Sequence, residues 1–341
     1  MDVSFHDQGR LLLEVTSGET ITLDGPPEGV LHSFPSFLEL EDHREDTWVF
    51  RIKRLSRDTI LFGRIRFRCH RGSPSMEIGI REKPVSPPSA ERLTFFPENA
   101  PSLSHLSGEV LLHPGEYDVS QGVYFSGTVC LFGEKGVTVL SGTKEVVRIE
   151  NAQNSYFSGL TFLHRGTRKG NVVVVLGGKV TFEHCTFSGG VQEKLTWMGN
   201  GLVIARGAEV VLRHCVFLNN QGSGIVVEKD SLLLVEDSLF CCNGKEGLSV
   251  RENASAQVYC SVFRENAWGI CLLPGSQGEF HTNRIESNKL GGVLVSRKSR
   301  ATFRANTVRQ HPVGVVLTPD SITCWEENTF AENQKDILEE G

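Results

Sequence analysis

A phrase that recurs at a nearly constant interval constrains this chain more than any other feature of its sequence. Each copy carries a large apolar anchor, usually an asparagine three residues later, and a glycine directly before an apolar triplet. The anchors are Phe162, Phe187, Phe217, Phe240, Phe263, Ile285, Val308 and Phe330. From Phe217 onwards, successive anchors lie 22 or 23 residues apart. Because separate markers keep one period through several copies, the sequence predicts a solenoid of stacked repeats.

Each repeat contains three short strand-like pieces and no piece long enough for a helix. In one copy they are VVL at 210–212, CVF at 215–217 and GIVV at 224–227. All three are rich in β-branched residues and bounded by turn formers, which favours extended structure. At a strand rise of ~3.3 Å, about 22 residues make one turn of a three-sided coil. The sequence therefore predicts an all-β fold, a right-handed parallel β-helix with 22–23 residues per coil.

Stacked coils bring equivalent residues into columns ~4.8 Å apart. The column two residues before the anchor holds Cys185, Cys215, Ser238, Ser261, Asn283, Asn306 and Asn328. The column three residues after it holds Asn220, Asn243, Asn266, Asn288, His311 and Asn333. Asparagine suits such positions because it tolerates the left-handed backbone of a tight turn and its amide can bond the next asparagine. Cys185 and Cys215 are predicted to be inward-facing, stacked and reduced.

The period divides the chain into three expected parts. Residues 1–83 lack it and contain short strand-like runs, which predicts a small, β-rich antiparallel module. Residues 84–104 are rich in proline and are predicted to form a connector. Residues 105–341 are predicted to form the β-helix.

Two stretches carry a resemblance to known proteins. The run GEVLLHPGEYDVSQGVYFSGTVCLFGEKGVTVLSG at 108–142 resembles the first coils of pectin-lyase-like β-helices, where a PG-x-Y turn precedes the regular coils. The later copies resemble the parallel β-helix repeats of carbohydrate-active enzymes, periplasmic copper-site maturation proteins, β-helix F-box proteins and the Shc SH2-domain-binding protein group. In character the chain is closest to the non-enzymatic intracellular members. The resemblance implies a fold, and a fold does not fix a function.

Composition argues against several function classes. The formal net charge of −6 argues weakly against nucleic-acid binding, because proteins of that class usually carry a basic excess. No apolar run approaches ~18 residues, so no membrane span is expected. The first residues, MDVSFHDQGRLLLEV, do not read as a signal peptide. The nine cysteines lack zinc-ligand spacing and are expected to be reduced, which predicts a cytoplasmic location and no cofactor.

The sequence predicts neither a catalytic constellation nor a metal site. Enzymes that act on polysaccharides need clustered acid and base groups on one face. The outward column four residues before the anchor holds Glu183, Arg213, Glu236, Tyr259, His281, Arg304 and Glu326, with no two acids adjacent. His184 and His214 are predicted to stack in neighbouring coils, but the repeat supplies no third ligand. Asp237 follows them in the same column, which leaves a weak site there open.

The third strand of each coil is apolar on both sides, so one of its faces is expected to be covered. The predicted packing face consists of Val173, Val203, Val226, Cys271, Leu294 and Val316. The favoured cover is the N-terminal module or the connector. The alternative is a partner or a second copy of the chain, which would give a homo-oligomer.

Two surface features are candidates for partner binding. The stretch from 287 to 319 has no acidic residue, and its basic side chains are expected to dock an acidic or phosphorylated partner, although solvated turns would explain them equally well. The predicted contacts there are Arg297, Lys298, Arg300, Arg304 and Arg309. An insertion at 188–200 adds Trp197 as a further predicted contact, because tryptophan is a frequent interface anchor.

These observations predict an intracellular, non-enzymatic β-helix protein that acts as a protein-interaction or scaffold module. The alternative is a carbohydrate-active or carbohydrate-binding β-helix protein, which a face lined with aromatic and carboxylate groups would favour. A third possibility is RNA or phosphate binding through the basic coils.

Overall fold

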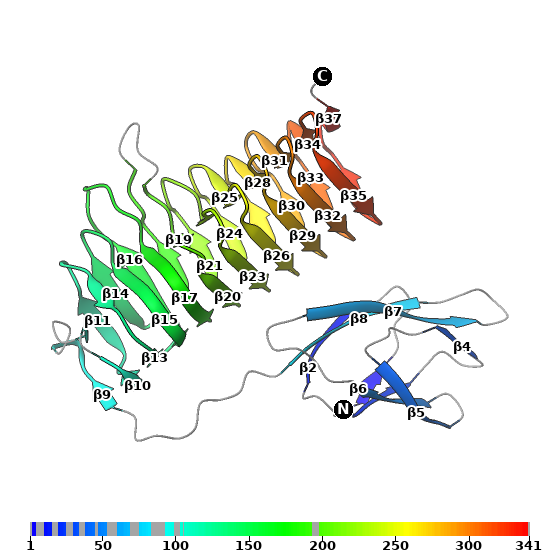
Figure 1. The fold of residues 1–341 in the computed structure, drawn as a ribbon, viewed down its shortest axis with the longest axis horizontal. Helices are drawn as coiled ribbons and strands as arrows, with labels where there is room; N and C mark the ends of the chain where they lie inside the picture. Colours follow the sequence, from blue (N-terminus) through cyan, green and yellow to red (C-terminus); the bar gives the residue numbers. More distant parts are fainter. Residues whose placement is uncertain are drawn as a thin grey trace. The chain divides into compact units, whose positions relative to one another are not determined.

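In the computed structural model the chain is all-β and divides into two units, residues 1–88 and 89–341. The structure describes residues 2–4, 10–15, 20–24, 30–33, 38–44, 47–52, 60–68, 75–82, 93–98, 103–104, 106–192 and 198–339. None of the described segments forms a helix with the length and apolar character needed to cross a bilayer. Figure 1 shows the stacked coils of the second unit along its full length.

The first unit consists of two four-stranded sheets. One contains β1 (Asp2–Ser4), β3 (Thr20–Asp24), β6 (Thr47–Ile52) and β5 (Leu38–Arg44), in that order. The other contains β2 (Arg10–Val15), β8 (Ser75–Glu82), β7 (Ile60–Arg68) and β4 (Val30–Ser33). Four of the six strand pairs are antiparallel, as predicted, and β1–β3 and β2–β8 are parallel. Ile21, Trp48 and Phe50 are buried in the first sheet.

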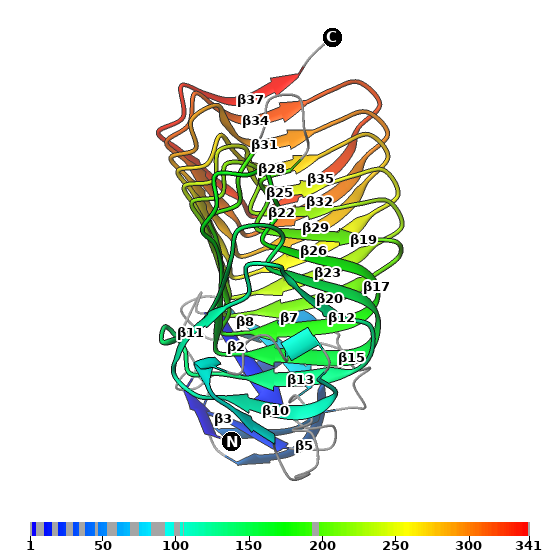
Figure 2. The same cartoon turned by 90° about the vertical axis from the view of Figure 1, so that its left-hand side faces the viewer.

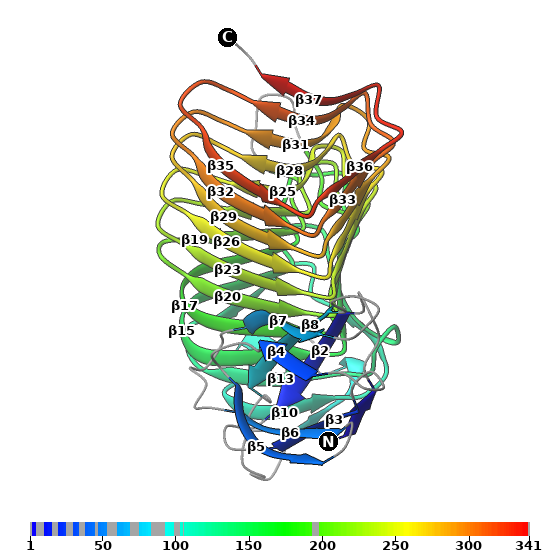
Figure 3. The same cartoon turned by 90° about the vertical axis from the view of Figure 1, so that its right-hand side faces the viewer.

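The second unit is a parallel β-solenoid with three faces, and each coil contributes one strand to each face (Figures 2 and 3). The first face contains β10 (Gly108–Leu112), β13 (Val129–Phe132), β20 (Glu209–Arg213), β23 (Leu232–Glu236), β26 (Ser255–Tyr259), β29 (Gln277–His281), β32 (Arg300–Arg304) and β35 (Ile322–Glu326). The second contains β11 (Gly115–Asp118), β14 (Thr138–Gly142), β16 (Leu160–His164), β18 (Thr186–Ser188), β21 (Val216–Leu218), β24 (Leu239–Cys241), β27 (Val262–Arg264), β30 (Arg284–Glu286), β33 (Thr307–Arg309) and β36 (Thr329–Ala331). The third contains β12 (Val123–Phe125), β19 (Leu202–Ala205), β22 (Ile225–Val227), β25 (Glu246–Val250), β28 (Trp268–Leu272), β31 (Gly291–Val295), β34 (Val313–Leu317) and β37 (Lys335–Glu339).

Two long strands, β15 (Val147–Ser158) and β17 (Val173–Glu183), pass from the third face to the first, and their pairing shifts register between Ala152 and Ser155. The solenoid begins before residue 105, where the β-helix is predicted to start. The strand β9 (Leu93–Phe95) pairs in parallel with β10, so part of the connector predicted at 84–104 already belongs to the coils.

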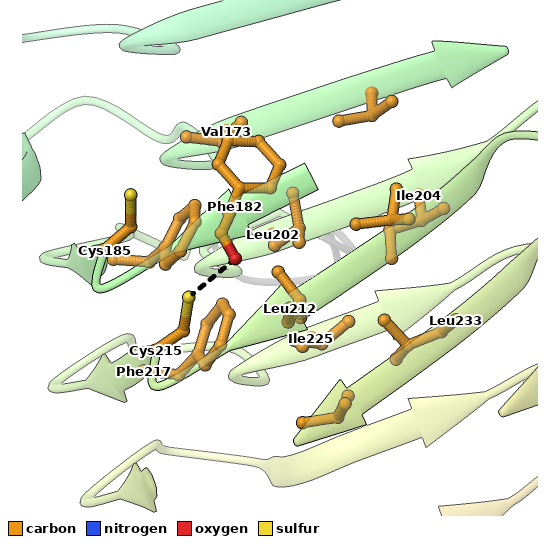
Figure 4. Close-up of a cluster of buried hydrophobic side chains, with 14 of the residues drawn as sticks. Val173, Phe182, Cys185, Leu202, Ile204, Leu212, Cys215, Phe217, Ile225 and Leu233 are labelled. Atoms are coloured by element: carbon orange, nitrogen blue, oxygen red, sulfur yellow. Dashed lines mark hydrogen bonds between the residues drawn. The ribbon is translucent and has the colours of Figure 1, made fainter. Parts of the chain in front are cut away.

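The strand register confirms the alignment of the repeats on their anchors. Phe187, Phe217, Phe240 and Phe263 face one another in successive coils of the second face, and all four are fully buried. Their rings stack with centroid distances of 4.6, 4.9 and 4.4 Å. Figure 4 shows Cys215 beside Phe217, with Cys185 in the neighbouring coil; both cysteines are buried free thiols. The predicted inward stack of these cysteines is therefore confirmed.

Two ladders of buried polar side chains join the coils at their corners. In one, Asn243 donates its amide hydrogens to Asn266 Oδ1 at 2.9 Å and to the carbonyl of Phe217 at 3.2 Å. The Asn243 backbone N–H also donates to Asn266 Oδ1, at 3.0 Å. The second ladder runs through the Ser, Cys and Asn column in the same way. The predicted asparagine-to-asparagine bonding is confirmed.

The left-handed backbone predicted for the ladder asparagines is found instead in the residues that precede them. The left-handed residue of this turn is the one directly before the ladder position: Asn219, Cys242, Glu265, Ser287, Gln310 and Glu332. The ladder side chain must point inward to reach the next coil, and the strained residue in front of it turns the chain. Left-handed backbone and ladder bonding are thus divided between two adjacent residues.

The apolar column of the third face differs from the prediction by one residue at its start. Val173 pairs with Leu202 in the inward column and is fully buried. The outward column contains Val174, Val203, Val226, Ser249, Cys271, Leu294 and Val316. The error arose because four consecutive valines, at 172–175, lead into and begin β17, so the sequence does not reveal which of them face inward. Val203 and Leu294 are half-buried, and the other members are 5% exposed or less.

The ring stack generates a test of the register. Replacing Phe240 or Phe263 with Ala should lower the free energy of unfolding by about 3–5 kcal/mol, because each ring is fully buried between two neighbours. Val262→Ala, on the outward side of the same strand, should cost under about 1 kcal/mol. Chemical denaturation measures all three variants. Near-wild-type stability of both phenylalanine variants would refute the stacked core.

One rung of the asparagine ladder is a histidine, and this makes stability depend on pH. His311 accepts a hydrogen bond from the Asn288 N–H at Nδ1, at 3.1 Å, and its Nε2 lies 3.1 Å from the Ile285 carbonyl. Both contacts are satisfied by a neutral ring that carries its hydrogen on Nε2. Burial is the main cause that lowers the pKa of His311, so the folded protein holds this proton less tightly than the unfolded chain.

The stabilisation from His311 is therefore present above the pKa of an unfolded histidine, about 6.5, and is lost as the pH falls through the lowered folded value. His311→Asn places at this position the asparagine that the other rungs carry. Between about pH 7 and about pH 5, this variant should lose less stability than the wild type. Denaturation midpoints at several pH values measure this. An unchanged pH profile in the variant would show that His311 is not the titrating rung.

Candidate functional site

The last residues of the first-face strands form one outward column, here called the end column. Strand pairing aligns Ser158, Glu183, Arg213, Glu236, Tyr259, His281, Arg304 and Glu326 in successive coils. Arg213 Nε lies 2.9 Å from Glu236 Oε2 in a buried ion pair. Arg304 Nε lies 3.7 Å from Glu326 Oε2. The alternation of charges that the sequence predicted is thus used for pairing between neighbouring coils.

The residue after each end-column position turns the chain into the second face. His184 and His214 occupy this turn in neighbouring coils, both with left-handed backbone at φ 53° and φ 52°. Their backbone N–H groups donate to the carbonyls of Arg213 and Glu236 in the following coils, at 2.9 and 3.1 Å. The two imidazole rings stack with a centroid distance of 4.7 Å and an angle of 10° between planes. The stacking of these histidines predicted from the sequence is confirmed.

Glu183 joins the two histidines in a single cluster, called here the histidine cluster. Ligand atoms of Glu183, His184 and His214 all lie within 4.8 Å of one another. The Glu183 carboxylate has one oxygen 4.0 Å from His184 Nε2 and accepts a hydrogen bond from the Tyr156 hydroxyl on the other. Burial, followed by the bond to Glu183, raises the pKa of Tyr156 above its ordinary value, so the hydroxyl remains a donor.

Sequence reasoning missed the third member of this cluster. The sequence pattern places Glu183 in the outward strand column and the two histidines in the corner column. It does not show that side chains of these two columns are in contact. The signal was present in the dipeptides Glu183–His184 and Arg213–His214, which place an outward strand residue directly beside the turn residue. The expectation that the repeat supplies no third ligand was wrong for this reason.

A second group of possible ligands lies at a different corner of the solenoid. Cys241 and Cys242 have sulfur atoms 2.9 Å apart, and Cys242 Sγ lies 3.3 Å from Glu265 Oε2. The hydrogen bond with Cys241 is the main cause that raises the pKa of Cys242 to about 12, with burial and Glu265 adding to it.

The structure distributes the predicted basic partner-binding residues over three locations. Arg297 and Lys298 lie in the turn between β31 and β32, Arg300 begins β32, and all three are exposed. Arg304 lies at the opposite end of β32, beside Glu326. The third location is β33, where Arg309 donates to Glu286 at 2.8 and 3.0 Å. Trp197 lies outside the described residues.

Comparison with known proteins identifies the architecture. The family model described as right handed beta helix region matches residues 119–263 and 247–339. No curated protein matches. An alginate lyase from Paenibacillus sp. has 13% identity and a TM-score of 0.51, over 72% of this chain and 100% of its own.

Two further solved structures are similar to this chain at lower TM-scores. The A-module of a mannuronan C-5 epimerase from Azotobacter vinelandii has 16% identity and a TM-score of 0.44, over 72% of this chain and 92% of its own. The catalytic domain of a GH87 α-1,3-glucanase has 9% identity and a TM-score of 0.42, over 86% of this chain and 74% of its own. The likeness to the alginate lyase shows the fold alone.

Proposed function

Because this chain belongs to the family of right-handed β-helix proteins, we propose that its coils bind a carbohydrate chain, with the histidine cluster and Tyr156 as the contact site. The supporting observation is the cluster itself. Three neighbouring coils present a hydroxyl, a carboxylate and two imidazoles within one small area. All of these groups form hydrogen bonds with sugar hydroxyls. The alginate lyase described above acts on a polysaccharide, and its likeness supports only the fold.

Rigid placement of the cluster also supports this proposal. Tyr156 and Glu183 lie on strands paired on both sides, and the histidine backbones are bonded to the next coil. His184 is 43% exposed and the Glu183 side chain 16% exposed, so solvent reaches the cluster. A site built on paired strands holds its groups more precisely than a site on loops. Little ordering of side chains is therefore needed when a ligand binds.

The type of chemistry is constrained by the carboxylates. Hydrolysis of a glycosidic bond generally uses two carboxyl groups about 5–9.5 Å apart, one on each side of the bond. The next acid of the end column after Glu183 is Glu236, and Arg213 already pairs with it. The cluster instead offers imidazole as a base and a tyrosine hydroxyl as a proton donor. Proton abstraction from a sugar ring, as in elimination or epimerisation, fits this set better than hydrolysis.

Binding to a panel of immobilised neutral and acidic polysaccharides tests the proposal. Wild-type protein should bind at least one of them, and His184→Ala and His214→Ala should each weaken binding about 10-fold or more. Thr282→Ala serves as the matched control, because Thr282 occupies the same left-handed turn position away from the cluster. If no polysaccharide binds, or if both histidine variants bind as tightly as wild type, the proposal is wrong.

A protein partner is a second candidate, favoured by the exposed basic corner formed by Arg297, Lys298 and Arg300. None of these three side chains forms an ion pair with a residue in the described part of the chain. Exposed arginines can make bidentate contacts with carboxylate or phosphate groups. A partner for this corner would carry an acidic or phosphorylated segment.

Charge reversal tests the basic corner. The triple variant Arg297→Glu, Lys298→Glu, Arg300→Glu should fold normally but bind more slowly to an array of acidic and phosphorylated peptides, with a weaker salt dependence. Lys289→Glu, which changes an exposed lysine elsewhere, should have a much smaller effect. Equal binding by the triple variant and wild type would leave the corner as ordinary solvated turns.

A further inference from the structure

We propose that Glu183, His184 and His214 form a binding site for a divalent transition-metal ion of the zinc type. Their ligand atoms lie within 4.8 Å of one another and come from two neighbouring coils. Two imidazoles with one carboxylate are a ligand set that such ions use with an open fourth position for water or substrate. The inference goes beyond carbohydrate binding, because metal uptake is measured without any sugar.

The coil spacing brings the two imidazoles together. His184 and His214 share one turn position, and each has its backbone N–H bonded to a carbonyl of the following coil. Their left-handed backbones, at φ 53° and φ 52°, are nearly identical, so the two side chains leave the turn in the same direction. The rings consequently lie parallel, 4.7 Å apart.

The carboxylate is oriented by a second group, as metal ligands commonly are. The Tyr156 hydroxyl donates to one oxygen of Glu183, and the other oxygen faces His184 Nε2 at 4.0 Å. Such supporting hydrogen bonds fix the direction of a ligand and raise its affinity for the ion. Tyr156 lies in β15, one coil before Glu183, so the support comes from the rigid part of the solenoid.

The ring of His184 contains an unsatisfied polar atom. Its Nδ1 is buried and has no hydrogen-bond partner among the described residues. Buried polar atoms in folded proteins are nearly always paired, so an unpaired ring nitrogen requires an explanation. Coordination of an ion by this nitrogen after rotation of the ring would satisfy it.

The separations suit a small ion after slight closure. Zinc bonds to nitrogen and oxygen are about 2.0–2.2 Å long, which places neighbouring ligands of a tetrahedral site roughly 3.4 Å apart. Ligand atoms within 4.8 Å therefore need to approach by at most about 1.4 Å. Calcium and magnesium prefer six or more oxygen ligands, so a site with two imidazoles selects against them.

The test is titration of the metal-depleted whole chain with Zn²⁺ alone, in a Cys241→Ser, Cys242→Ser background. That background removes the other group of possible ligands in the described residues. Calorimetry should give one ion per chain. Affinity should fall at least about 10-fold in His184→Ala and in His214→Ala, and by about 10-fold in Tyr156→Phe, which acts only through Glu183. Thr282→Ala should bind as the background does.

Two additional measurements keep the outcome clear. Co²⁺ loading should give a visible spectrum without thiolate charge-transfer absorption, since no sulfur ligand is involved. Circular dichroism checks that each variant is folded, and Glu183→Gln replaces any histidine variant that is not. No stoichiometric Zn²⁺ binding, binding unchanged in the folded variants, or a thiolate spectrum would overturn the inference. Zinc binding without polysaccharide binding would support the metal site and refute the proposed function.

Discussion

Hydrogen bonds between successive coils are the constraint on which the rest of this structure depends. A ladder asparagine such as Asn266, fully buried, donates to the carbonyl of Phe240 and accepts from the backbone and amide of Asn243. Because these groups are buried, a coil shifted by one residue would leave several of them unpaired, at a cost of about 1–3 kcal/mol each. The ladders therefore fix the register, and the register places every outward side chain.

This dependence explains how much could be predicted from the sequence. The fold and the anchor stack followed from the period, since a column such as Phe217, Phe240 and Phe263 repeats at the spacing that defines it. The orientation of Val173 could not be predicted, because consecutive valines carry no alternation. Glu183 was not predicted as a member of the histidine cluster. The repeat period shows which residues align between coils, but it does not show which adjacent columns are in contact. Arg297 lies on the surface, as the sequence predicts. The ion pair between Arg309 and Glu286 could not be predicted from the sequence.

Charge along the end column follows the same logic. Equivalent positions lie one coil apart, so two like charges in succession would repel at close range. No two acids are adjacent in this column, and Arg213 with Glu236 forms a buried pair. A buried pair of this kind contributes little net stability, although removal of either partner alone is costly. Glu183 accepts a hydrogen bond from Tyr156 with one carboxylate oxygen, and the other oxygen lies 4.0 Å from His184 Nε2.

The corner occupied by His184 and His214 is the position where the fold demands least of the side chain. In the other coils this left-handed turn holds Asp237, Cys260, Thr282, Ala305 and Glu327, so backbone bonding alone maintains it. The left-handed backbone costs roughly 1–2 kcal/mol for a residue with a Cβ whichever residue is present. Stability consequently gives no reason for two imidazoles in adjacent coils beside a carboxylate. A position that the fold leaves open, filled by groups that bind protons and metal ions, is where a solenoid can acquire a site without disturbing its core.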